Sequence, residues 1–292
     1  MDKILLVNKD KGYTSRDVVN CLSQVFHTNK MGHFGTLDPL ATGLLIIGIG
    51  KYTKVGNLFE SDYKEYVAEA LIGISTDTYD VTGTITKRVD IKEIDKDIII
   101  NVLNKYRGLY LQEVPIYSAV KVDGKKLYEY ARKGESVTLP KKLVNIRSIE
   151  LIDIYEKDNK LYFSFRCNVS KGTYIRSLIN DMGKSINIPM CMSNLKRTKQ
   201  DKFSLDDAYT IKDIKNGNYK LLDIEDVIDL DVVEVPNSLY DVVKNGGLIK
   251  KTGDKPILFR RNGKNIALYM DYDKNKNTMK PFIFYGGKWY EF

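Results

Sequence analysis

The chain has 292 residues, 43% of them hydrophobic, which predicts one large domain or a main domain with a smaller one attached. A formal charge of +8 and an isoelectric point of about 9.0 favour an anionic partner, usually nucleic acid, although a lysine-rich composition alone produces the same excess. Three widely spaced cysteines and two histidines argue against a disulfide framework and a zinc site, so we expect reduced cytoplasm as the compartment.

Neither a signal peptide nor a membrane span is expected. The opening MDKILLVNKDKG has too short an apolar stretch for a signal peptide. No run approaches the roughly 20 apolar residues of a membrane helix.

Short strand and helix patterns alternate in the first 108 residues. Apolar residues recur on one face after Thr14 and Ser15, either of which can cap a helix. The expected elements are, in order, a strand at 3–8, this helix, a strand at 44–50, a short helix at 51–61, a strand at 63–76 and a helix ending at Gly108.

The next hundred residues continue the mixture. We expect a strand at 118–124, a helix from about Lys125 that stops at Gly134, two strands around a turn at Asp158-Asn159, and a helix at 174–185. Strands and helices do not alternate strictly. The sequence therefore predicts an α+β fold with a mixed, mostly antiparallel sheet.

A composition shift begins near residue 215, where an acidic connection, IEDVIDLDVVE, leads into a basic segment. From Val243 to Ala267 the chain has seven basic residues against one acid, Asp254. The alternating runs ILFRRNG, NIALYMDY and FIFYGGKWYEF are separated by turns. We therefore expect a main domain at 1–215 and a small β-rich domain at 230–292.

The segment GHFGTLDPLATG, Gly32 to Gly43, concentrates a histidine, a proline, three glycines and a single carboxylate before an apolar run. It is no phosphate loop, because Leu45 stands where the first glycine is needed and Tyr52 replaces the hydroxyl residue. Asp-Pro is a common turn signal, so Asp38 has a purely structural interpretation. A glycine-rich loop ahead of a buried strand is also where reactive carboxylates occur.

The extended segment GHFGTLDPLATGLLIIGIGKYTK resembles the catalytic motif of the TruB-type tRNA pseudouridine synthases. Five further segments resemble the family in order over about Lys3–Ala208: NKDKGYTS, DYKEYVAEALIGISTDTYDVTG, VPIYSAVKVDGKKLYEYARKG, VSKGTYIRSLINDMG and NLKRTKQDKFSLDDA. Two positions depart from the family pattern, Asp10 in place of a proline and Phe34 in place of a threonine. Neither departure removes a reactive group.

The resemblance implies a catalytic domain of pseudouridine-synthase type, an RNA-gripping segment at about 113–142 and a PUA-like RNA-binding domain at the C-terminus. It also implies an intramolecular-transfer isomerase that flips uridine 55 out of the T loop of tRNA and converts it to pseudouridine. Nothing is oxidised or hydrolysed, so no cofactor or metal is expected. We expect a monomer that needs no protein partner.

The resemblance also assigns roles to single residues. Asp38 is the catalyst, by attack on the sugar, attack on the base, or removal of a sugar proton. The other assignments are Arg176 pairing with Asp38, Tyr66 stacking on the base or transferring a proton, His33 holding the RNA loop open, Leu195 packing near the base, Lys9 contacting the motif loop or RNA, and Lys64 and Lys121 binding substrate.

Each assignment has a structural alternative. Arg176 could bind a phosphate at the surface, Leu195 could belong to the core, and any single lysine could be solvated. Tyr66 is one of 20 tyrosines, most of them structural. Two other functions stay open: a guide-dependent synthase, and an RNA-binding or RNA-folding protein without essential catalysis.

Overall fold

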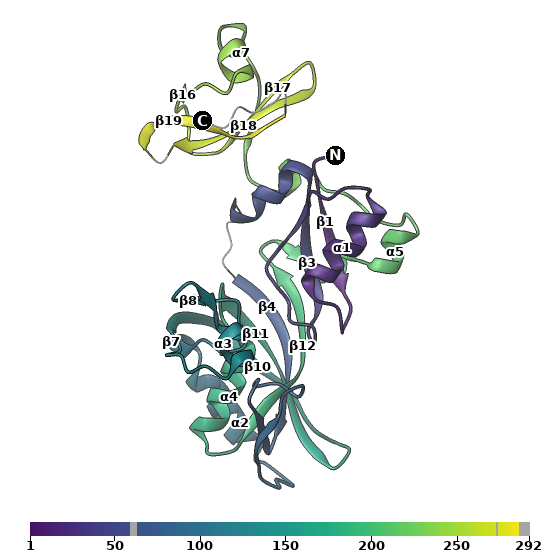
Figure 1. The fold of residues 1–292 in the computed structure, drawn as a ribbon, viewed down its shortest axis with the longest axis vertical. Helices are drawn as coiled ribbons and strands as arrows, with labels where there is room; N and C mark the ends of the chain where they lie inside the picture. Colours follow the sequence, from purple (N-terminus) through teal and green to yellow (C-terminus); the bar gives the residue numbers. More distant parts are fainter. Residues whose placement is uncertain (59–62, 273, 286–292) are drawn as a thin grey trace. The chain divides into compact units, whose positions relative to one another are not determined.

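The computed structural model describes residues 1–58, 63–272 and 274–285, and these form two compact units (Figure 1). Within the described residues, one unit consists of 5–47 and 63–220, and the other of 1–4, 48–58, 221–272 and 274–285. The predicted site residues all belong to the first unit.

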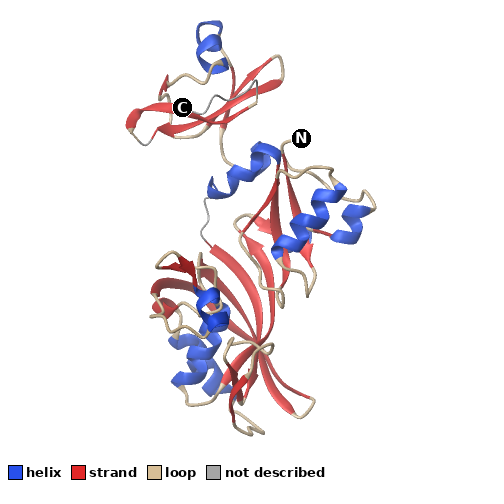
Figure 2. Ribbon diagram, viewed as in Figure 1, coloured by secondary structure: helices blue, strands red, loops and turns tan. Residues whose placement is uncertain are grey.

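A large sheet dominates the fold (Figure 2). Its strand order is β14-β1-β3-β12-β4-β11-β10-β7. The pairs β1–β14 and β3–β12 are parallel, whereas β12, β4, β11, β10 and β7 pair antiparallel. The predicted mixed, mostly antiparallel sheet is therefore confirmed. Its strands are β1 (Lys3–Lys9), β2 (Met31–Phe34), β3 (Thr42–Ile49), β4 (Tyr63–Ile72), β7 (Gly108–Glu113), β10 (Lys141–Lys157), β11 (Lys160–Ser170), β12 (Met190–Gln200), β13 (Phe203–Ser204) and β14 (Tyr209–Thr210).

Helices and two small strand pairs complete this part of the chain. Helix α1 begins after Thr14, whose hydroxyl accepts a hydrogen bond from the Asp17 backbone N–H at 3.0 Å, while the Asp17 carboxylate binds the Thr14 N–H at 2.8 Å. The elements are α1 (Ser15–Val25), α2 (Lys96–Lys105), α3 (Leu127–Lys133), α4 (Ile175–Ser185), η2 (Leu205–Asp207), α5 (Ile211–Lys215), and the pairs β5 (Ile74–Thr76) with β6 (Ile85–Arg88) and β8 (Lys121–Val122) with β9 (Lys125–Lys126).

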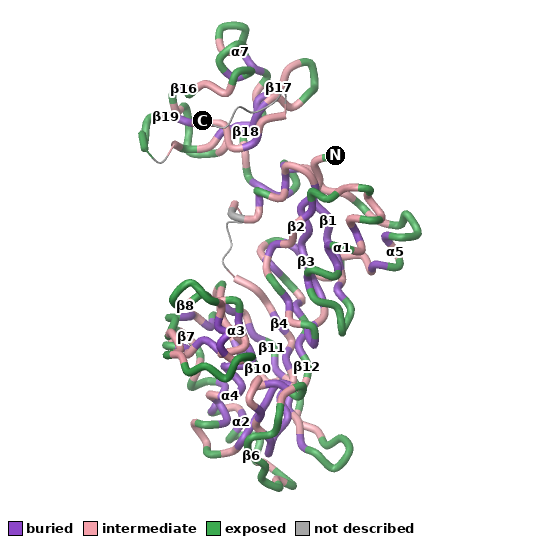
Figure 3. The backbone as a smooth tube through the Cα atoms, in the orientation of Figure 1, coloured by how far each residue is buried: buried purple, intermediate pink, exposed green. Residues whose placement is uncertain are grey.

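Strand β3 is buried along almost its whole length (Figure 3). Its residues Leu44–Ile47 are completely buried, because both faces of this strand are covered. The run is apolar throughout, as expected for a strand without a solvent-facing side. The loop that carries Asp38 therefore leads directly into a fully buried part of the sheet.

Four predicted elements had wrong bounds: the strand expected at 118–124 is only the two-residue β8 (Lys121–Val122), and the other three differ at a glycine or a lysine pair. Helix α2 ends at Lys105, and Gly108, with φ of +95°, begins β7. The strand expected at 63–76 breaks at Gly73, with φ of +88°, into β4 and β5. Lys125 and Lys126 pair with β8, so α3 begins at Leu127.

Other predictions are confirmed. Helix α3 ends at Gly134 in the left-handed conformation, with φ of +65°. Asp158 and Asn159, with φ of +51° and +55°, form the turn between β10 and β11.

The second unit contains a five-stranded sheet of order β15-β17-β18-β19-β16. The segment 224–234, expected to be a connection, instead forms a short helix and a strand of this sheet. The unit's elements are η1 (Gly50–Leu58), α6 (Ile224–Val227), β15 (Asp231–Glu234), α7 (Asn237–Lys244), β16 (Ile249–Lys250), β17 (Ile257–Arg261), β18 (Lys264–Tyr272) and β19 (Asn275–Phe284). The ends of the expected helix at 51–61 and of the run FIFYGGKWYEF fall at 59–61 and 286–292, outside the described residues.

Part of the basic excess in this unit is paired with acids. Lys251 binds Asp271 at 2.7 Å, and Arg260 binds Glu225 at 2.6 Å. The surface charge that this unit offers to a polyanion is therefore smaller than the sequence count suggests.

Candidate active site

Asp38 lies in the loop between β2 and β3, and the N-terminal motif holds that loop. The Ser15 hydroxyl accepts a hydrogen bond from the Leu37 N–H at 2.9 Å and contacts the Leu37 carbonyl at 3.2 Å. The Gly12 N–H donates to the Pro39 carbonyl at 2.8 Å. Backbone on both sides of Asp38 is thus fixed, while its side chain remains 38% exposed.

Arg176 reaches this loop from the first turn of α4. Its Nε lies 2.9 Å from Asp38 Oδ2, and the arginine side chain is only 7% exposed. Nη1 donates to the Thr78 carbonyl and Nη2 to the Tyr117 carbonyl, each at 3.1 Å. A guanidinium bound on several sides presents a fixed positive charge to the Asp38 carboxylate.

A second carboxylate, Asp80, stands behind Arg176. Asp80 Oδ2 lies 3.7 Å from Arg176 Nη1, and both side chains are 7% exposed. Asp80 Oδ1 accepts hydrogen bonds from the Thr82 N–H and the Thr78 hydroxyl, both at 2.9 Å. Asp80 therefore balances the charge of the buried Arg176 and helps to orient its guanidinium toward Asp38.

Tyr66 projects from β4, the strand between β11 and β12, opposite Cys167 and Arg197. It is 7% exposed. Burial raises the pKa of the Tyr66 hydroxyl, and the Arg197 guanidinium beside it partly opposes this shift. Tyr66 is accordingly a neutral phenol near pH 7, able to donate a hydrogen bond.

Arg197 is a completely buried guanidinium beneath the motif loop. Its Nε donates to the Leu44 carbonyl at 2.7 Å and its Nη2 to the Gly35 carbonyl at 2.9 Å. Arg197 thus binds the backbone on both sides of the Asp38 loop to β12, the strand that pairs with β4 beside Tyr66.

Gly43 is required where β3 passes Arg197. It has φ of +98°, and a Cβ there would lie 2.3 Å from the Arg197 carbonyl oxygen. We expect Gly43→Ala to lower the free energy of unfolding by about 3 kcal/mol, through backbone strain and the steric clash. Urea denaturation would measure this loss.

Gly217→Ala is the matched control for that prediction. Gly217 has φ of +79°, but nothing lies within 4 Å of its Cβ position. It should lose only about 1 kcal/mol, from the left-handed backbone alone. Equal losses for the two variants would show that the contact with Arg197 contributes nothing.

Asp38, Tyr66 and Arg176 line a cleft of about 740 Å³. His33, Lys64 and Leu195 line it together with Asp38, Tyr66 and Arg176. Burial lowers the pKa of His33, and Arg16 and Arg197 lower it further, which favours the neutral imidazole. Further residues that line it are Thr14, Arg16, Tyr117, Lys126, Tyr128 and Tyr174.

Lys9 and Lys121 lie elsewhere and are not among the described residues that line this cleft. Lys9 is fully buried, and its ammonium group donates to the carbonyls of Asp10 at 3.0 Å and Tyr13 at 2.6 Å. Burial lowers its pKa to about 8. Lys121 is exposed on β8.

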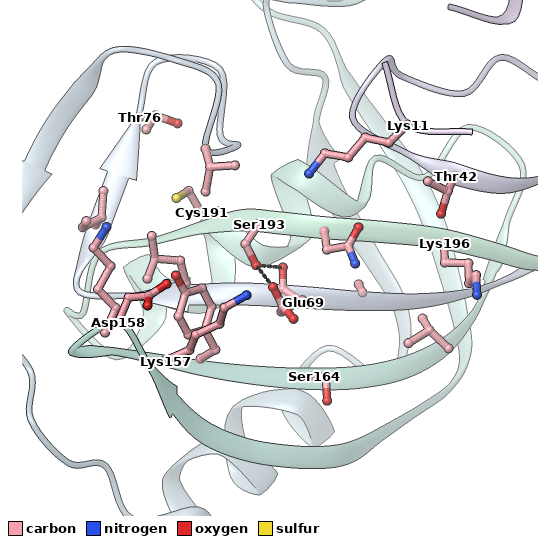
Figure 4. A pocket seen from close by; sticks show the side chains of 18 of the residues that line it. Lys11, Thr42, Glu69, Thr76, Lys157, Asp158, Ser164, Cys191, Ser193 and Lys196 are labelled. Carbon is pink, nitrogen blue, oxygen red and sulfur yellow. Dashed lines mark hydrogen bonds between the residues drawn. The ribbon is translucent and has the colours of Figure 1, made fainter. Parts of the chain in front are cut away.

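A second, larger cavity of about 910 Å³ contains none of the predicted site residues (Figure 4). It is lined by Val67, Glu69 and Leu71, which alternate with Tyr66 along β4 and so face the other side of the sheet. Ser193 donates to Glu69 Oε1 there at 2.5 Å. The Glu69 carboxylate is thus hydrogen-bonded within the protein. The candidate catalytic residues Asp38, Tyr66 and Arg176 lie in the smaller cleft.

Within the described residues, no cluster of three or more His, Cys, Asp or Glu side chains is arranged to hold a metal ion. In the same part of the chain, no helix has the length and apolar character to cross a membrane.

A family model described as TruB family pseudouridylate synthase (N terminal domain) matches residues 23–175, just over half of the chain. The chain belongs to the TruB family of pseudouridylate synthases. The tRNA pseudouridine synthase B of Lactobacillus acidophilus is 37% identical over 298 residues, covering 97% of this chain and 98% of its own length. That of Mesoplasma florum is 37% identical over 280 residues, covering 95% and 96%.

Solved structures agree on the fold. A chain of a Cbf5-Nop10-Gar1 complex has a TM-score of 0.66 and 23% identity, covering 92% of this chain and 78% of its own. A chain of an H/ACA RNP bound to a substrate RNA containing 2′-deoxyuridine has a TM-score of 0.66 and 20% identity, covering 97% and 84%. The predicted pseudouridine-synthase type of fold is confirmed.

Sequence reasoning missed two site residues of this TruB-family chain, Asp80 and Arg197. The run of aspartates and threonines in STDTYDVTG, directly after a strand, was the available signal for Asp80. Arg197 had none, because a lysine- and arginine-rich strand such as NLKRTK predicts surface cations. Only the parallel pairing of β12 with β3 places Arg197 under the motif loop.

Proposed function

We propose that this protein isomerises uridine to pseudouridine at position 55 in the T loop of tRNA, as a cytoplasmic monomer without guide RNA, protein partner, metal or cofactor. The observation that carries the proposal is the Asp38 carboxylate, paired with Arg176 in a cleft that Tyr66 also lines. The tRNA substrate is supported by relatives named tRNA pseudouridine synthase B that match nearly the whole chain.

The reaction breaks the bond between N1 of uracil and C1′ of ribose, turns the base, and joins C5 to C1′. The C5 proton is lost and N1 gains a proton, so the isomerisation needs neither oxidant nor water. Asp38 serves by attack on the sugar, by attack on the base, or by taking a sugar proton, and each route needs its ionised carboxylate. Arg176 pairs with that carboxylate at 2.9 Å and fixes its position.

The target base must leave its stack to reach Asp38. We assign His33 to the space that the base vacates, Tyr66 to stacking on the flipped uracil, and Leu195 to apolar contact beside it. All three side chains line the same cleft as Asp38.

RNA affinity comes from the gripping segment at about 113–142 and from a PUA-like domain at 230–292. Tyr128 stands at the cleft with Lys126 Nζ 5.4 Å and the Arg132 guanidinium carbon 5.2 Å from its ring centre. An aromatic ring flanked by two cations suits an unstacked base and its phosphates. Lys121 adds an exposed charge on the neighbouring β8–β9 pair.

Tyr66→Phe tests the proton-transfer part of this proposal. The variant keeps the ring that stacks and removes the hydroxyl that donates, so kcat should fall about 100-fold while tRNA affinity holds. Single-turnover kinetics and filter binding would separate the two effects. Full activity of Tyr66→Phe would reduce the role of Tyr66 to stacking.

The proposed position is tested by mapping the product. The purified full-length protein is incubated with an unmodified tRNA transcript, and pseudouridine is located by carbodiimide labelling and primer extension. One stop, at position 55, is expected. A stop at another nucleotide would overturn the position, and tight binding without any stop would favour the guide-dependent or the binding-only function.

A further inference from the structure

Gln112, in the edge strand β7, holds the start of the helix that carries Arg176. Its side chain is buried, with 1% exposure. Gln112 Nε2 donates to the Tyr174 carbonyl at 3.0 Å, and the Tyr174 N–H donates to Gln112 Oε1 at 2.8 Å. One amide thus pairs with both backbone groups of a single residue, which fixes that residue's position and orientation.

Tyr174 is the N-cap residue of α4, and Arg176 follows two residues later. The Tyr174 side chain makes no capping hydrogen bond, and the first turn of α4 contains no acidic residue. The first residue of a helix is usually held by its own side chain. Here Gln112, on strand β7, holds the backbone at the start of α4 instead.

The remaining polar capacity of Gln112 is also used. The second N–H of its amide contacts the Tyr110 hydroxyl, on the same strand. A buried amide whose donors are all engaged has little freedom to rotate, so it transmits the position of β7 to α4.

The other end of Arg176 is bound by Asp38 and by the Tyr117 carbonyl, and Tyr117 lies five residues after Gln112. The segment 112–117 thus contacts both the backbone at the start of α4 and the guanidinium. Fixing both ends of a long side chain removes the freedom that would let its head drift from the carboxylate.

We propose that Gln112 is a positioning residue for the isomerisation, acting through Tyr174 on Arg176 and so on Asp38. The inference rests on the proposed function for its kinetic consequences. The structural part of the inference, that the Gln112 amide holds the Arg176 guanidinium against Asp38 through Tyr174, does not depend on the substrate.

Two variants of Gln112 test the role. Gln112→Leu removes both hydrogen bonds to Tyr174 and should lower kcat about 10- to 100-fold, with tRNA affinity nearly unchanged, since a displacement of about 1 Å costs on that order. Gln112→Glu keeps an acceptor for the Tyr174 N–H, but its carboxylate faces the Tyr174 carbonyl without a donor.

The pH profile distinguishes positioning from loss of stability. Burial raises the pKa of the carboxyl group introduced by Gln112→Glu, and once protonated that group can again donate to the Tyr174 carbonyl. The ratio of its kcat to that of the wild type should therefore rise about fivefold or more as pH falls from about 8.5 to about 5.5. Gln112→Leu should show no such recovery.

Tyr106→Phe is the matched control. The Tyr106 hydroxyl donates to the Asp181 carbonyl at 2.8 Å, so this variant removes a hydrogen bond to a later turn of the same helix. It should lower the melting temperature while leaving kcat within about twofold.

A second measurement is independent of activity. Exchange of the Arg176 Nε–H with water, followed by nuclear magnetic resonance, reports on its bond to Asp38. Exchange should accelerate at least about tenfold in Gln112→Leu and stay unchanged in Tyr106→Phe. Unchanged exchange in Gln112→Leu, or full kcat beside an active wild type, would overturn the proposal. An inactive wild type would count against the proposed function instead, and the exchange rates would still decide the role of Gln112.

Discussion

Asp38→Asn is expected to abolish isomerisation and to leave tRNA binding intact. The amide has nearly the shape of the carboxylate but is a poor nucleophile and no useful base, so all three routes open to Asp38 fail together. We expect the single-turnover rate constant to fall at least about 10³-fold.

Binding should survive because the loop around Asp38 does not depend on its charge. Ser15 and Gly12 hold the neighbouring backbone, and Arg176 retains its bonds to the carbonyls of Thr78 and Tyr117. Filter binding of the same tRNA should give a Kd within about threefold of the wild type. A comparable loss of binding and rate would instead indicate a structural role for Asp38.

Arg176→Lys should produce the second-largest effect, a fall in kcat of at least about 100-fold. Lysine keeps the charge, but its single nitrogen cannot reach the acceptors on Asp38, Thr78 and Tyr117, which bind three different nitrogens spread across the guanidinium. The carboxylate would lose its fixed partner, and buried acceptors would lose their donors.

The kinetic pattern separates this role from phosphate binding at the surface. A residue that acts on Asp38 lowers kcat, whereas a residue that grips RNA raises KM. Arg166→Lys is the matched control, because Arg166 is 50% exposed and pairs with Glu65 at 3.1 Å on β4. It should change kcat less than twofold, and a rise in KM alone for Arg176→Lys would contradict the pairing role.

Much of the fold could be predicted because local signals and tertiary demands agree. Thr14 caps α1, Gly134 ends α3, and Asp158-Asn159 turns β10 into β11, as their backbone preferences require. The end of α2 was predicted wrongly at Gly108, because a glycine with positive φ can end a helix or begin a strand equally well.

The site was only partly predictable from the sequence. Asp38, Tyr66 and Arg176 follow from motifs that resemble a family, and the structure brings them to one cleft. Asp80, Arg197 and Gln112 act on those residues through contacts between segments far apart in the chain, and such contacts leave no local pattern. Lys9 was expected to contact the motif loop or the RNA, but its ammonium group donates to carbonyls of its own neighbours, Asp10 and Tyr13, in the turn after β1.

Tritium release from a tRNA transcript labelled at C5 of uridine tests the central claim most directly. The purified wild-type protein is added without guide RNA, metal or cofactor, beside a second transcript with cytidine at position 55. One equivalent of tritium per labelled tRNA is expected from the first transcript and none from the second. No release despite tight binding, or equal release from both transcripts, would contradict a stand-alone synthase acting at that position.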